Sequence, residues 1–494
     1  MNRLESAPSS RFARHRRTGL GSRRDPSGAG TVSYSVGGGL LYVFAPPRQR
    51  LTGAVGITHD TFPAQTASPS VAAGRRTTRL TSVPTPVLVA MTAIVGVAIA
   101  VARCPSTIRH PELYAEDGLV WFSNAYNSGP WRPLLWAHTG YLQTFPRLVA
   151  DLGLLVPIRR LPLLFVVVAV VVQVLPACFL VTRRLENVIP SLSVRCVLAL
   201  TYFLLPNSQE VNANLTNAQW HLALLAFLVV IAEDGGWPWR VFDLFVVALS
   251  ALTGPFVIVL APISLVVYLV RQRRWSRVLT VVLFTVAILQ LIEFATSGTS
   301  RSHFAPLGVT GPRLFEILGG QVVGGTALGP PATYAGQLPS SPWLCFLLFL
   351  AGAAFVLFAI WRGPLELRLL NVFAGVILLS ALASPVVSAV GFQWQNLTVD
   401  PSARYWFLPT CALVADVIWA GSHLTPRNRL LAVVSFVCLA CIVVFGVRNG
   451  FEYQALTPRP DWASESNAFT HVPSGTSYTF VEVPAGFSFT LTKH

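Results

Sequence analysis

Long stretches of apolar residues constrain this chain more than any other feature of its sequence. Residues 161–182 and 343–361 contain no acidic or basic side chain, and each is close to the roughly 20 residues that a helix needs to cross a bilayer. A soluble chain cannot bury many such stretches, and here 53% of the 494 residues are hydrophobic and 12% are charged, with a mean hydropathy of +0.57. The sequence therefore predicts a membrane protein.

The apolar stretches predict an all-α polytopic membrane protein with about eleven transmembrane helices. The predicted spans lie near 86–103, 161–182, 192–206, 218–232, 241–252, 256–270, 278–295, 343–361, 369–391, 405–420 and 428–446. Prolines and glycines interrupt the region 192–270, which indicates paired half-length helices around polar turns. Non-helical backbone at membrane depth is tolerated only where it is buried in protein or lines a cavity. We therefore expect other helices to cover this region, or the region to line a cavity.

The net charge of +15 would suit a nucleic-acid-binding protein if a folded domain presented it. Residues 1–83 instead carry twelve arginines against three acids, in a segment rich in Ser, Gly, Thr and Pro without apolar periodicity. Few aromatic residues lie among these arginines, so nucleic acid is not an expected partner. We predict a disordered basic cytoplasmic tail, which either anchors the first span by the positive-inside rule or precedes the true start of the protein.

Arginines in the short loops predict the orientation, because positively charged loops stay in the cytoplasm. One set of alternate loops holds eleven arginines, whereas the other set holds only Arg404. With a cytoplasmic N-terminus, this pattern predicts a multi-pass protein of the cell membrane. Its transmembrane domain covers 84–446, with outer loops at 104–160 and 296–342. The extracytoplasmic tail 447–494 contains an alternating stretch that predicts a small hairpin.

The first outer loop contains two adjacent acids, Glu116 and Asp117. They are followed by Leu119, Phe122 and Tyr126, which share one face of a predicted short helix lying in the membrane interface. Two roles fit the acids. They can cap that helix, or one of them can act as a general base toward a hydroxyl, with a pKa raised by the interface.

Two further groups of polar residues are predicted on the same side of the membrane. Asn217, Gln219 and His221 belong to a polar run at the outer end of a span, where they either contact a ligand or form hydrogen bonds between helices. His221 is the member best suited to contact a ligand. Arg301 and His303 lie in the glycine-rich second outer loop, whose backbone we expect to be mobile. That loop either closes over a substrate or simply connects two spans.

Arg404 is the exception to the charge asymmetry of the loops, and it stands beside Tyr405 at the mouth of a helix. A guanidinium there can bind a phosphate through two hydrogen bonds, and this is the role that we expect, with Tyr405 in the same substrate site. The alternative is that Arg404 reaches the headgroups of membrane lipids.

The order of these parts resembles the GT-C superfamily of integral membrane glycosyltransferases, which includes protein O-mannosyltransferase and aminoarabinose transferase relatives. The likeness covers roughly 86–446: an N-terminal span, an outer loop with the pair Glu116-Asp117, an interfacial aromatic helix, paired short spans and a second long outer loop. The resemblance implies transfer of a sugar from a polyprenyl-phosphate carrier to an extracytoplasmic acceptor. It implies that Asp117 is the general base and that Glu116 is its neighbour or a ligand for metal or substrate.

The expected partners are a polyprenyl-phosphate sugar donor, an acceptor hydroxyl on a cell-envelope glycan, lipid or protein, and membrane lipids. The phosphate leaving group needs cations, for which Arg404, Arg301 and His221 are the candidates. The sequence identifies no cofactor, and a divalent metal bound by the acids is one option. Two other functions stay open: a flippase or transporter for a lipid-linked saccharide, and a polysaccharide polymerase that uses outer-loop arginines.

Overall fold

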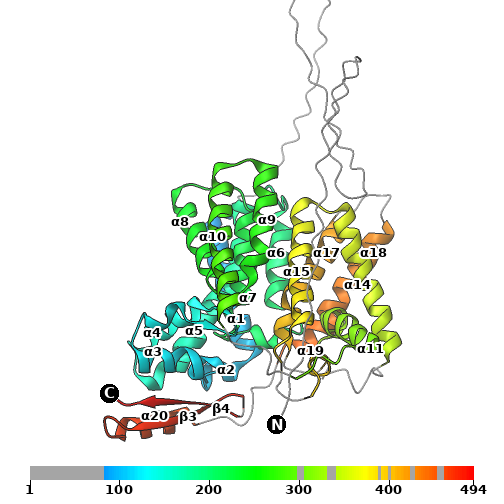
Figure 1. Cartoon of the computed structure of the whole chain (residues 1–494). Helices are drawn as coiled ribbons and strands as arrows, with labels where there is room; N and C mark the ends of the chain where they lie inside the picture. Colours follow the sequence, from blue (N-terminus) through cyan, green and yellow to red (C-terminus); the bar gives the residue numbers. More distant parts are fainter. Residues whose placement is uncertain are drawn as a thin grey trace, which may run out of the picture. The chain divides into compact units, whose positions relative to one another are not determined.

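The computed structural model describes residues 83–297, 305–330, 341–387, 391–398, 402–422, 429–452, 461–484 and 486–494. Helices make up almost all of the regular structure in this part of the chain, and two pairs of short strands complete it (Figure 1). The tail predicted over residues 1–83 lies, apart from Val83, outside the described residues.

Six helical segments in the described part are long and apolar enough to cross a membrane, which supports a multi-pass membrane protein. They are α1 (Thr85–Arg103), η3 (Ile158–Arg160) with α5 (Leu161–Leu180), α10 (Arg274–Thr296), α14 (Pro342–Arg362), α15 (Leu365–Ala383), and α18 (Arg429–Cys441) with η10 (Ile442–Val447) and α19 (Arg448–Gly450). Helices satisfy their own backbone groups, which is what an apolar surrounding demands of a spanning segment.

The other five predicted spans form helices of 12 to 16 residues, which are shorter than a bilayer is thick. They are α6 (Leu192–Phe203), α7 (Ala218–Ile231), α8 (Trp237–Ala251), α9 (Phe256–Arg271) and α17 (Phe407–Ser422). Their ends fall where the sequence breaks the pattern: α6 ends before Pro206, and α9 begins directly after Pro255. Each of the eleven predicted spans therefore contains a helix, and six of these segments have the length to span alone.

Helix α7 lies at the centre of the bundle, because every one of its fourteen residues is buried. Helices α5, α8, α9 and α17 pack around it. A helix that is apolar on every side is stable only where other helices cover it. The ring of Phe227 stacks on Phe373 of α15 with centroids 5.6 Å apart, which joins α7 to α15.

The chain between α1 and α5 folds into a layer at one end of the bundle, which we call the Asp117 end (the lower end in Figure 1). Its elements are α2 (Pro105–Arg109), η1 (Asp117–Phe122), α3 (Ser123–Ser128), η2 (Arg132–Leu135), β1 (Ala137–His138), β2 (Tyr141–Leu142) and α4 (Thr144–Gly153). Strands β1 and β2 pair antiparallel, with Ala137 opposite Leu142.

The short helix after Asp117 differs from the amphipathic helix that the sequence predicts. Residues 117–122 form a π-helix, whose wider turn changes which side chains share a face. Trp121 and Phe122 are buried, whereas Leu119 is 43% exposed. The rings of Phe122 and Tyr126 do contact each other, with centroids 5.9 Å apart, but the exposed Leu119 does not join them, because η1 turns its aromatic side chains toward α4 and the C-terminal strands.

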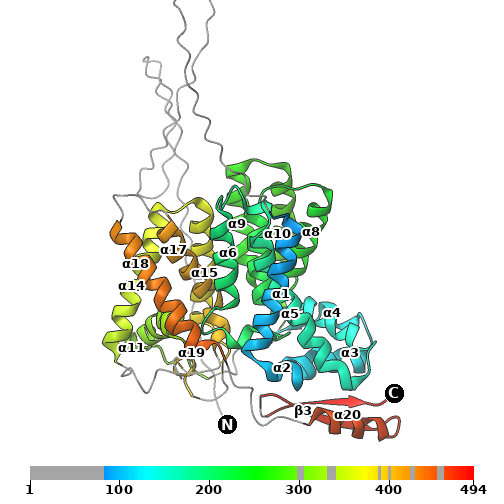
Figure 2. The same ribbon diagram turned by 180° about the vertical axis from the view of Figure 1, so that it is seen from behind.

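The C-terminal segment packs on this layer. It consists of α20 (Trp462–His471), β3 (Ser477–Glu482) and β4 (Phe487–Thr492), and the two strands pair antiparallel with Phe480 opposite Phe489. Both phenylalanines are buried in one apolar cluster with Trp121 and Phe122. Figures 1 and 2 show this segment alongside α3.

The glycine-rich second loop is helical over residues 311–328, in α11 (Gly311–Phe315), η7 (Glu316–Gly324) and α12 (Gly325–Leu328). A Cβ built on Gly319 would lie 1.8 Å from the carbonyl oxygen of Cys345 on α14. Gly319 thus allows η7 and α14 to touch, which gives this glycine a role in packing. The remaining short elements are η4 (Arg183–Leu185), η5 (Gln209–Val211), α16 (Gln393–Asn396) and η8 (Ala403–Trp406).

Candidate functional site

Asp117, at the first residue of η1, is a buried carboxyl group whose two oxygens each accept a hydrogen bond. The hydroxyl of Thr216 donates to Oδ1 at 2.8 Å, and the backbone N–H of Tyr114 donates to Oδ2 at 3.1 Å. Burial raises the pKa of Asp117 to about 7, although both hydrogen bonds act to lower it. Asp117 therefore changes its charge near neutral pH, unlike an ordinary surface aspartate.

Thr216 also accepts a hydrogen bond from Nε1 of Trp121 at 2.9 Å. This chain of contacts joins the loop before α7 to both ends of η1, because Trp121 lies one turn after Asp117. The indole fixes the hydroxyl, and the hydroxyl fixes the carboxyl group. Thr216 comes directly before Asn217 of the predicted polar run, and the structure gives its hydroxyl a defined partner.

Glu116 is half-buried and lies next to Asp117 at the start of the helix. Burial raises the pKa of Glu116, while its own backbone and the cation of Arg404 lower it. Burial also raises the pKa of the neighbouring Tyr114, and the charges of Glu210, Glu116 and Asp117 raise it further. These mutual effects place the acid pair and the Glu210–Arg404 pair in one electrostatic environment.

A carboxyl group from the C-terminal hairpin completes the start of η1. Glu482 accepts the backbone N–H groups of Gly118 and Leu119, each at 3.0 Å. These are first-turn donors that the helix itself cannot satisfy. Burial raises the pKa of Glu482 to about 8, with the charge of Asp117 as the next cause. Glu482 was not predicted as a site residue. Its alternation with exposed residues along the strand is the one local sign that its side chain points inward.

The same hairpin holds the turn that presents the acids. Ala115 has a positive φ of 52°, a conformation that costs a non-glycine residue on the order of 1 kcal/mol. Its N–H donates to the carbonyl oxygen of Val483 at 2.6 Å, and the N–H of Val483 donates to Leu113 at 3.2 Å. A left-handed residue supported from both sides is typical of a functional turn.

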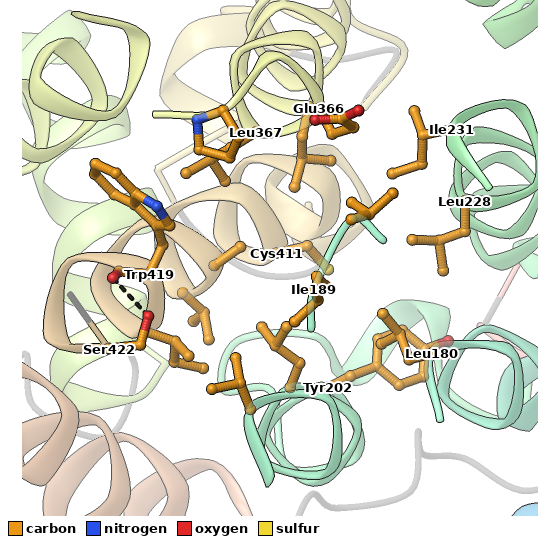
Figure 3. A pocket seen from close by; sticks show the side chains of 18 of the residues that line it. Leu180, Ile189, Tyr202, Leu228, Ile231, Glu366, Leu367, Cys411, Trp419 and Ser422 are labelled. Carbon is orange, nitrogen blue, oxygen red and sulfur yellow. Dashed lines mark hydrogen bonds between the residues drawn. The ribbon is translucent and has the colours of Figure 1, made fainter. Parts of the chain in front are cut away.

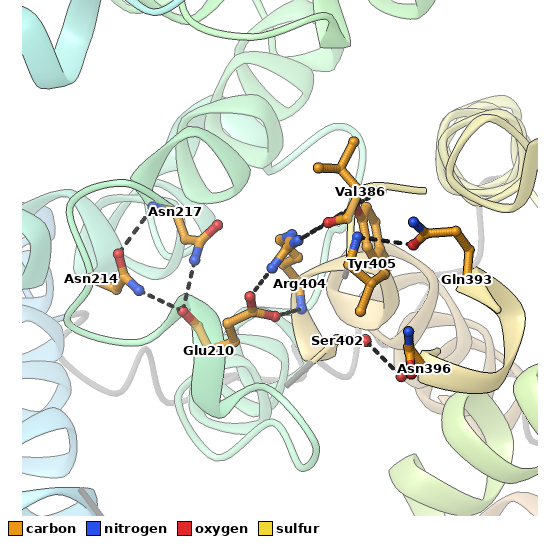
Figure 4. A network of polar contacts seen from close by, with 10 residues as sticks. Glu210, Asn214, Asn217, Val386, Gln393, Asn396, Ser402, Arg404 and Tyr405 are labelled. Atoms are coloured by element: carbon orange, nitrogen blue, oxygen red, sulfur yellow. Dashed lines mark hydrogen bonds and ion pairs between the residues drawn. The ribbon is translucent and has the colours of Figure 1, made fainter. Parts of the chain in front are cut away.

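Arg404 forms an ion pair with Glu210, and its backbone N–H donates to the other carboxylate oxygen at 3.0 Å (Figure 4). Its guanidinium also donates to the carbonyl oxygen of Val386, whose N–H donates to the hydroxyl of Tyr405 at 2.9 Å. Any phosphate bound by Arg404 would therefore have to share the cation with Glu210. Glu210 was not predicted as a site residue, because no local sequence pattern distinguishes it from an ordinary solvent-exposed acid.

Other predicted residues of the polar run act as supports. The side chain of Asn217 donates to the backbone oxygen of Glu210 at 3.1 Å. His221 is 1% exposed, and its ring nitrogens contact the hydroxyl of Tyr202 at 2.7 Å and the carbonyl oxygen of Val211 at 2.8 Å. His221 thus positions α6 and the loop before α7, and both of its nitrogens are occupied.

Gln219 is also buried, but its Oε1 has no hydrogen-bond partner. Arg301 and His303, the predicted residues of the second loop, lie outside the described residues. Among the described residues no group of three or more His, Cys, Asp or Glu side chains is arranged to hold a metal ion.

An apolar cavity of about 630 Å³ lies elsewhere in the bundle, between α6, α7, α15 and α17 (Figure 3). Leu228 and Ile231 of α7 face Leu367 of α15 across it, and Cys411 of α17 and Tyr202 of α6 close its sides. Its lining suits hydrocarbon rather than a saccharide, because few polar groups face inward.

The site at the Asp117 end thus combines a carboxyl group that titrates near neutrality with a second buried acid and a nearby ion pair. Such a carboxyl group can accept a proton from a hydroxyl at neutral pH, provided that the hydroxyl reaches it. The structure brings Glu116, Asp117, Asn217, Arg404 and Tyr405 to this end of the bundle.

No protein-family model matches this chain, and no curated protein matches its sequence.

Proposed function

We propose that this chain is an integral membrane glycosyltransferase that moves a sugar from a polyprenyl-phosphate carrier to an acceptor hydroxyl outside the cytoplasm. Asp117 is the general base. The observation that carries the proposal is the burial of Asp117, which raises its pKa to about 7 at the end of an apolar helical bundle. A base is most effective when its pKa lies near the working pH.

The reaction is a displacement at the anomeric carbon. The acceptor O–H loses its proton to Asp117 while the acceptor oxygen forms a bond to the anomeric carbon. The bond from that carbon to the phosphate oxygen breaks, and the polyprenyl phosphate leaves with the electron pair. Glu116, beside the base, is placed to hold the acceptor or the sugar by accepting hydrogen bonds from their hydroxyl groups.

The surroundings of Asp117 support this role. Thr216 and the Tyr114 N–H hold both carboxyl oxygens, so the base is oriented before substrate binds. A donor with a lipid carrier suits a site at the end of membrane helices, because its hydrocarbon stays in the bilayer while the sugar reaches the surface.

The test is a transfer assay with purified protein and a radiolabelled polyprenyl phosphosugar. We expect Asp117→Asn to lower the transfer rate by about 10²–10⁴-fold, the usual contribution of a general base. Glu116→Gln should have a smaller effect that is mainly on KM. If both variants transfer label as fast as the wild type, the proposed mechanism is wrong.

A proton-coupled transporter of a lipid-linked saccharide is the second candidate. It is favoured by the two buried carboxyl groups, Asp117 and Glu482, with pKa values raised to about 7 and 8, since such groups can carry protons. The apolar lining of the cavity in Figure 3 does not suit passage of a sugar. Proteoliposomes distinguish the two functions: a transporter moves the labelled lipid between leaflets unchanged, whereas a transferase releases polyprenyl phosphate.

A further inference from the structure

Arg147, on α4 at the Asp117 end, is a buried cation that forms no ion pair with another described residue. Its side chain is 2% exposed, and Nε and Nη1 have no hydrogen-bond partner. It takes part in none of the ion pairs between described residues. Burial lowers the pKa of Arg147 to about 10, so it keeps its charge at neutral pH. The charge of Asp151, one turn along the helix, raises the pKa of Arg147, but this carboxylate accepts its hydrogen bond from the backbone N–H of Trp131, at 3.1 Å, and not from the guanidinium.

A buried charge without a hydrogen-bonded partner is costly, and a bound ligand of opposite charge would offset that cost. The contacts that Arg147 does make are aromatic. Its Cζ lies 5.0 Å from the centroid of the Trp121 ring, which holds the guanidinium in place but does not neutralise it. The ring of His138 meets the same indole edge-on, with centroids 5.2 Å apart.

Further buried polar atoms without partners lie along the same part of the molecule. Oε1 of Gln143 is one of them, on the residue before α4. Oε1 of Gln219 is another, and a Cβ built on Gly254 would lie 2.4 Å from it. The turn at Thr253 and Gly254 pairs with Gln143 in an antiparallel bridge. Two amide side chains thus flank one turn, and their unpartnered carbonyl oxygens can accept hydrogen bonds from hydroxyl groups such as those of a sugar.

Trp121 connects Arg147 to the proposed base. The indole that packs against the guanidinium donates from Nε1 to Thr216, and Thr216 donates to Asp117. One indole therefore contacts both groups. Its ring face packs against the guanidinium of Arg147, and its Nε1 binds the hydroxyl that donates to Asp117. Arg404 is less suited to a phosphate, because Glu210 already neutralises it.

We propose that Arg147 binds the phosphate of the lipid-linked donor and stabilises the charge that develops on it as it leaves. This inference rests on the proposed function and assigns the leaving-group site within it. The donor holds its phosphate as a diester and releases it as a monoester, and both forms carry acceptor oxygens that a guanidinium with unused N–H groups matches.

The test uses isothermal titration of the full-length protein in detergent with farnesyl phosphate as the probe. We expect Arg147→Gln to weaken binding at least tenfold, whereas Arg132→Gln, an exposed arginine of the same layer, should bind as the wild type does. Equal affinity in R147Q and wild type would overturn the assignment. Equal binding of phosphatidic acid and farnesyl phosphate would also overturn it, because the site would then recognise any lipid phosphate.

Thermal unfolding without ligand gives a second readout. A buried cation kept for a ligand destabilises the empty protein, so R147Q should melt at a higher temperature than the wild type. A purely structural arginine would show the opposite shift. If R147Q does not fold, Arg147→Lys decides, since it keeps the charge without the planar donors and should bind farnesyl phosphate at least threefold more weakly.

The transfer assay separates this inference from the proposed function. Transfer by the wild type together with unchanged transfer by R147Q would refute the role of Arg147 alone. Loss of farnesyl phosphate binding in R147Q, in a protein whose wild type transfers no sugar, would refute the proposed function and leave the phosphate site standing.

Discussion

Thr216 donates a hydrogen bond of 2.8 Å to the carboxyl group of Asp117, across 99 residues of chain. The contact places a hydroxyl from the loop before α7 on an acid from the loop after α1. A hydrogen bond to a carboxylate favours its charged form, so this single contact opposes the effect of burial on the pKa of Asp117.

Removing that hydroxyl should shift the pH dependence of the reaction. In Thr216→Val we expect the midpoint of the kcat/KM profile to move up by about one pH unit, because a hydrogen bond to a charged group contributes about 1.5–3 kcal/mol. Thr216→Ser is the matched control, since it keeps the hydroxyl, and its midpoint should stay near that of the wild type. An unchanged midpoint in T216V would contradict the contact's role.

The wild-type protein should itself show a pH profile governed by Asp117. The base works as a carboxylate, and burial raises its pKa to about 7. Below that pH we expect kcat/KM to fall about tenfold per unit, and above it to reach a plateau. A profile that stays flat from pH 5 to pH 8 would show that Asp117 does not act as the base.

Glu482 should make the stability of the protein depend on pH. Its pKa is raised from 4.5 in the unfolded chain to about 8, so its contribution is fully present below pH 4.5 and is lost as the pH rises through 8. We expect the melting temperature of the wild type to fall between pH 5 and pH 9, and to fall less steeply in Glu482→Gln. Glu452→Gln, which removes an exposed acid, should leave the slope unchanged.

Removing one partner of the Glu210–Arg404 pair should destabilise the protein. Glu210→Gln leaves the arginine without its acid, and we expect a loss of about 3 kcal/mol in stability, measured by denaturation in detergent. The double variant E210Q/R404Q should recover part of that loss. In the exposed pair, Asp234→Asn should change the stability of the protein far less than E210Q does. Equal losses in E210Q and D234N would show that the Glu210 pair is not buried in solution.

Gly319 should tolerate no side chain. Gly319→Ala places a methyl group 1.8 Å from the carbonyl oxygen of Cys345, so we expect a loss of at least about 2 kcal/mol. At Gly375, inside α15, a Cβ meets nothing within 4 Å, and Gly375→Ala should raise stability by about 0.5 kcal/mol. A stable G319A protein would mean that η7 and α14 do not touch.

The positions of the helices could be predicted from the sequence because apolar length and proline breaks are local properties. The run 161–182 becomes α5, and Pro206 and Pro255 bound α6 and α9 as expected. The face of the helix after Asp117 could not be predicted, because a π-turn changes the angle between successive side chains and a period of 3.6 assumes an α-helix.

The acid pair itself was visible in the sequence, but its chemistry was not. By itself, the sequence determined that this is an apolar, multi-helical chain with adjacent acids after its first long helix. The tertiary structure was needed to show that Thr216 binds the buried Asp117, that Glu482 accepts the N–H of the next residue, Gly118, that Glu210 pairs with Arg404, and that Arg147 forms no ion pair with another described residue. Hydropathy belongs to each residue alone, whereas burial and charge pairing depend on partners far away in the chain, from 99 residues for Thr216 to 364 residues between Gly118 and Glu482.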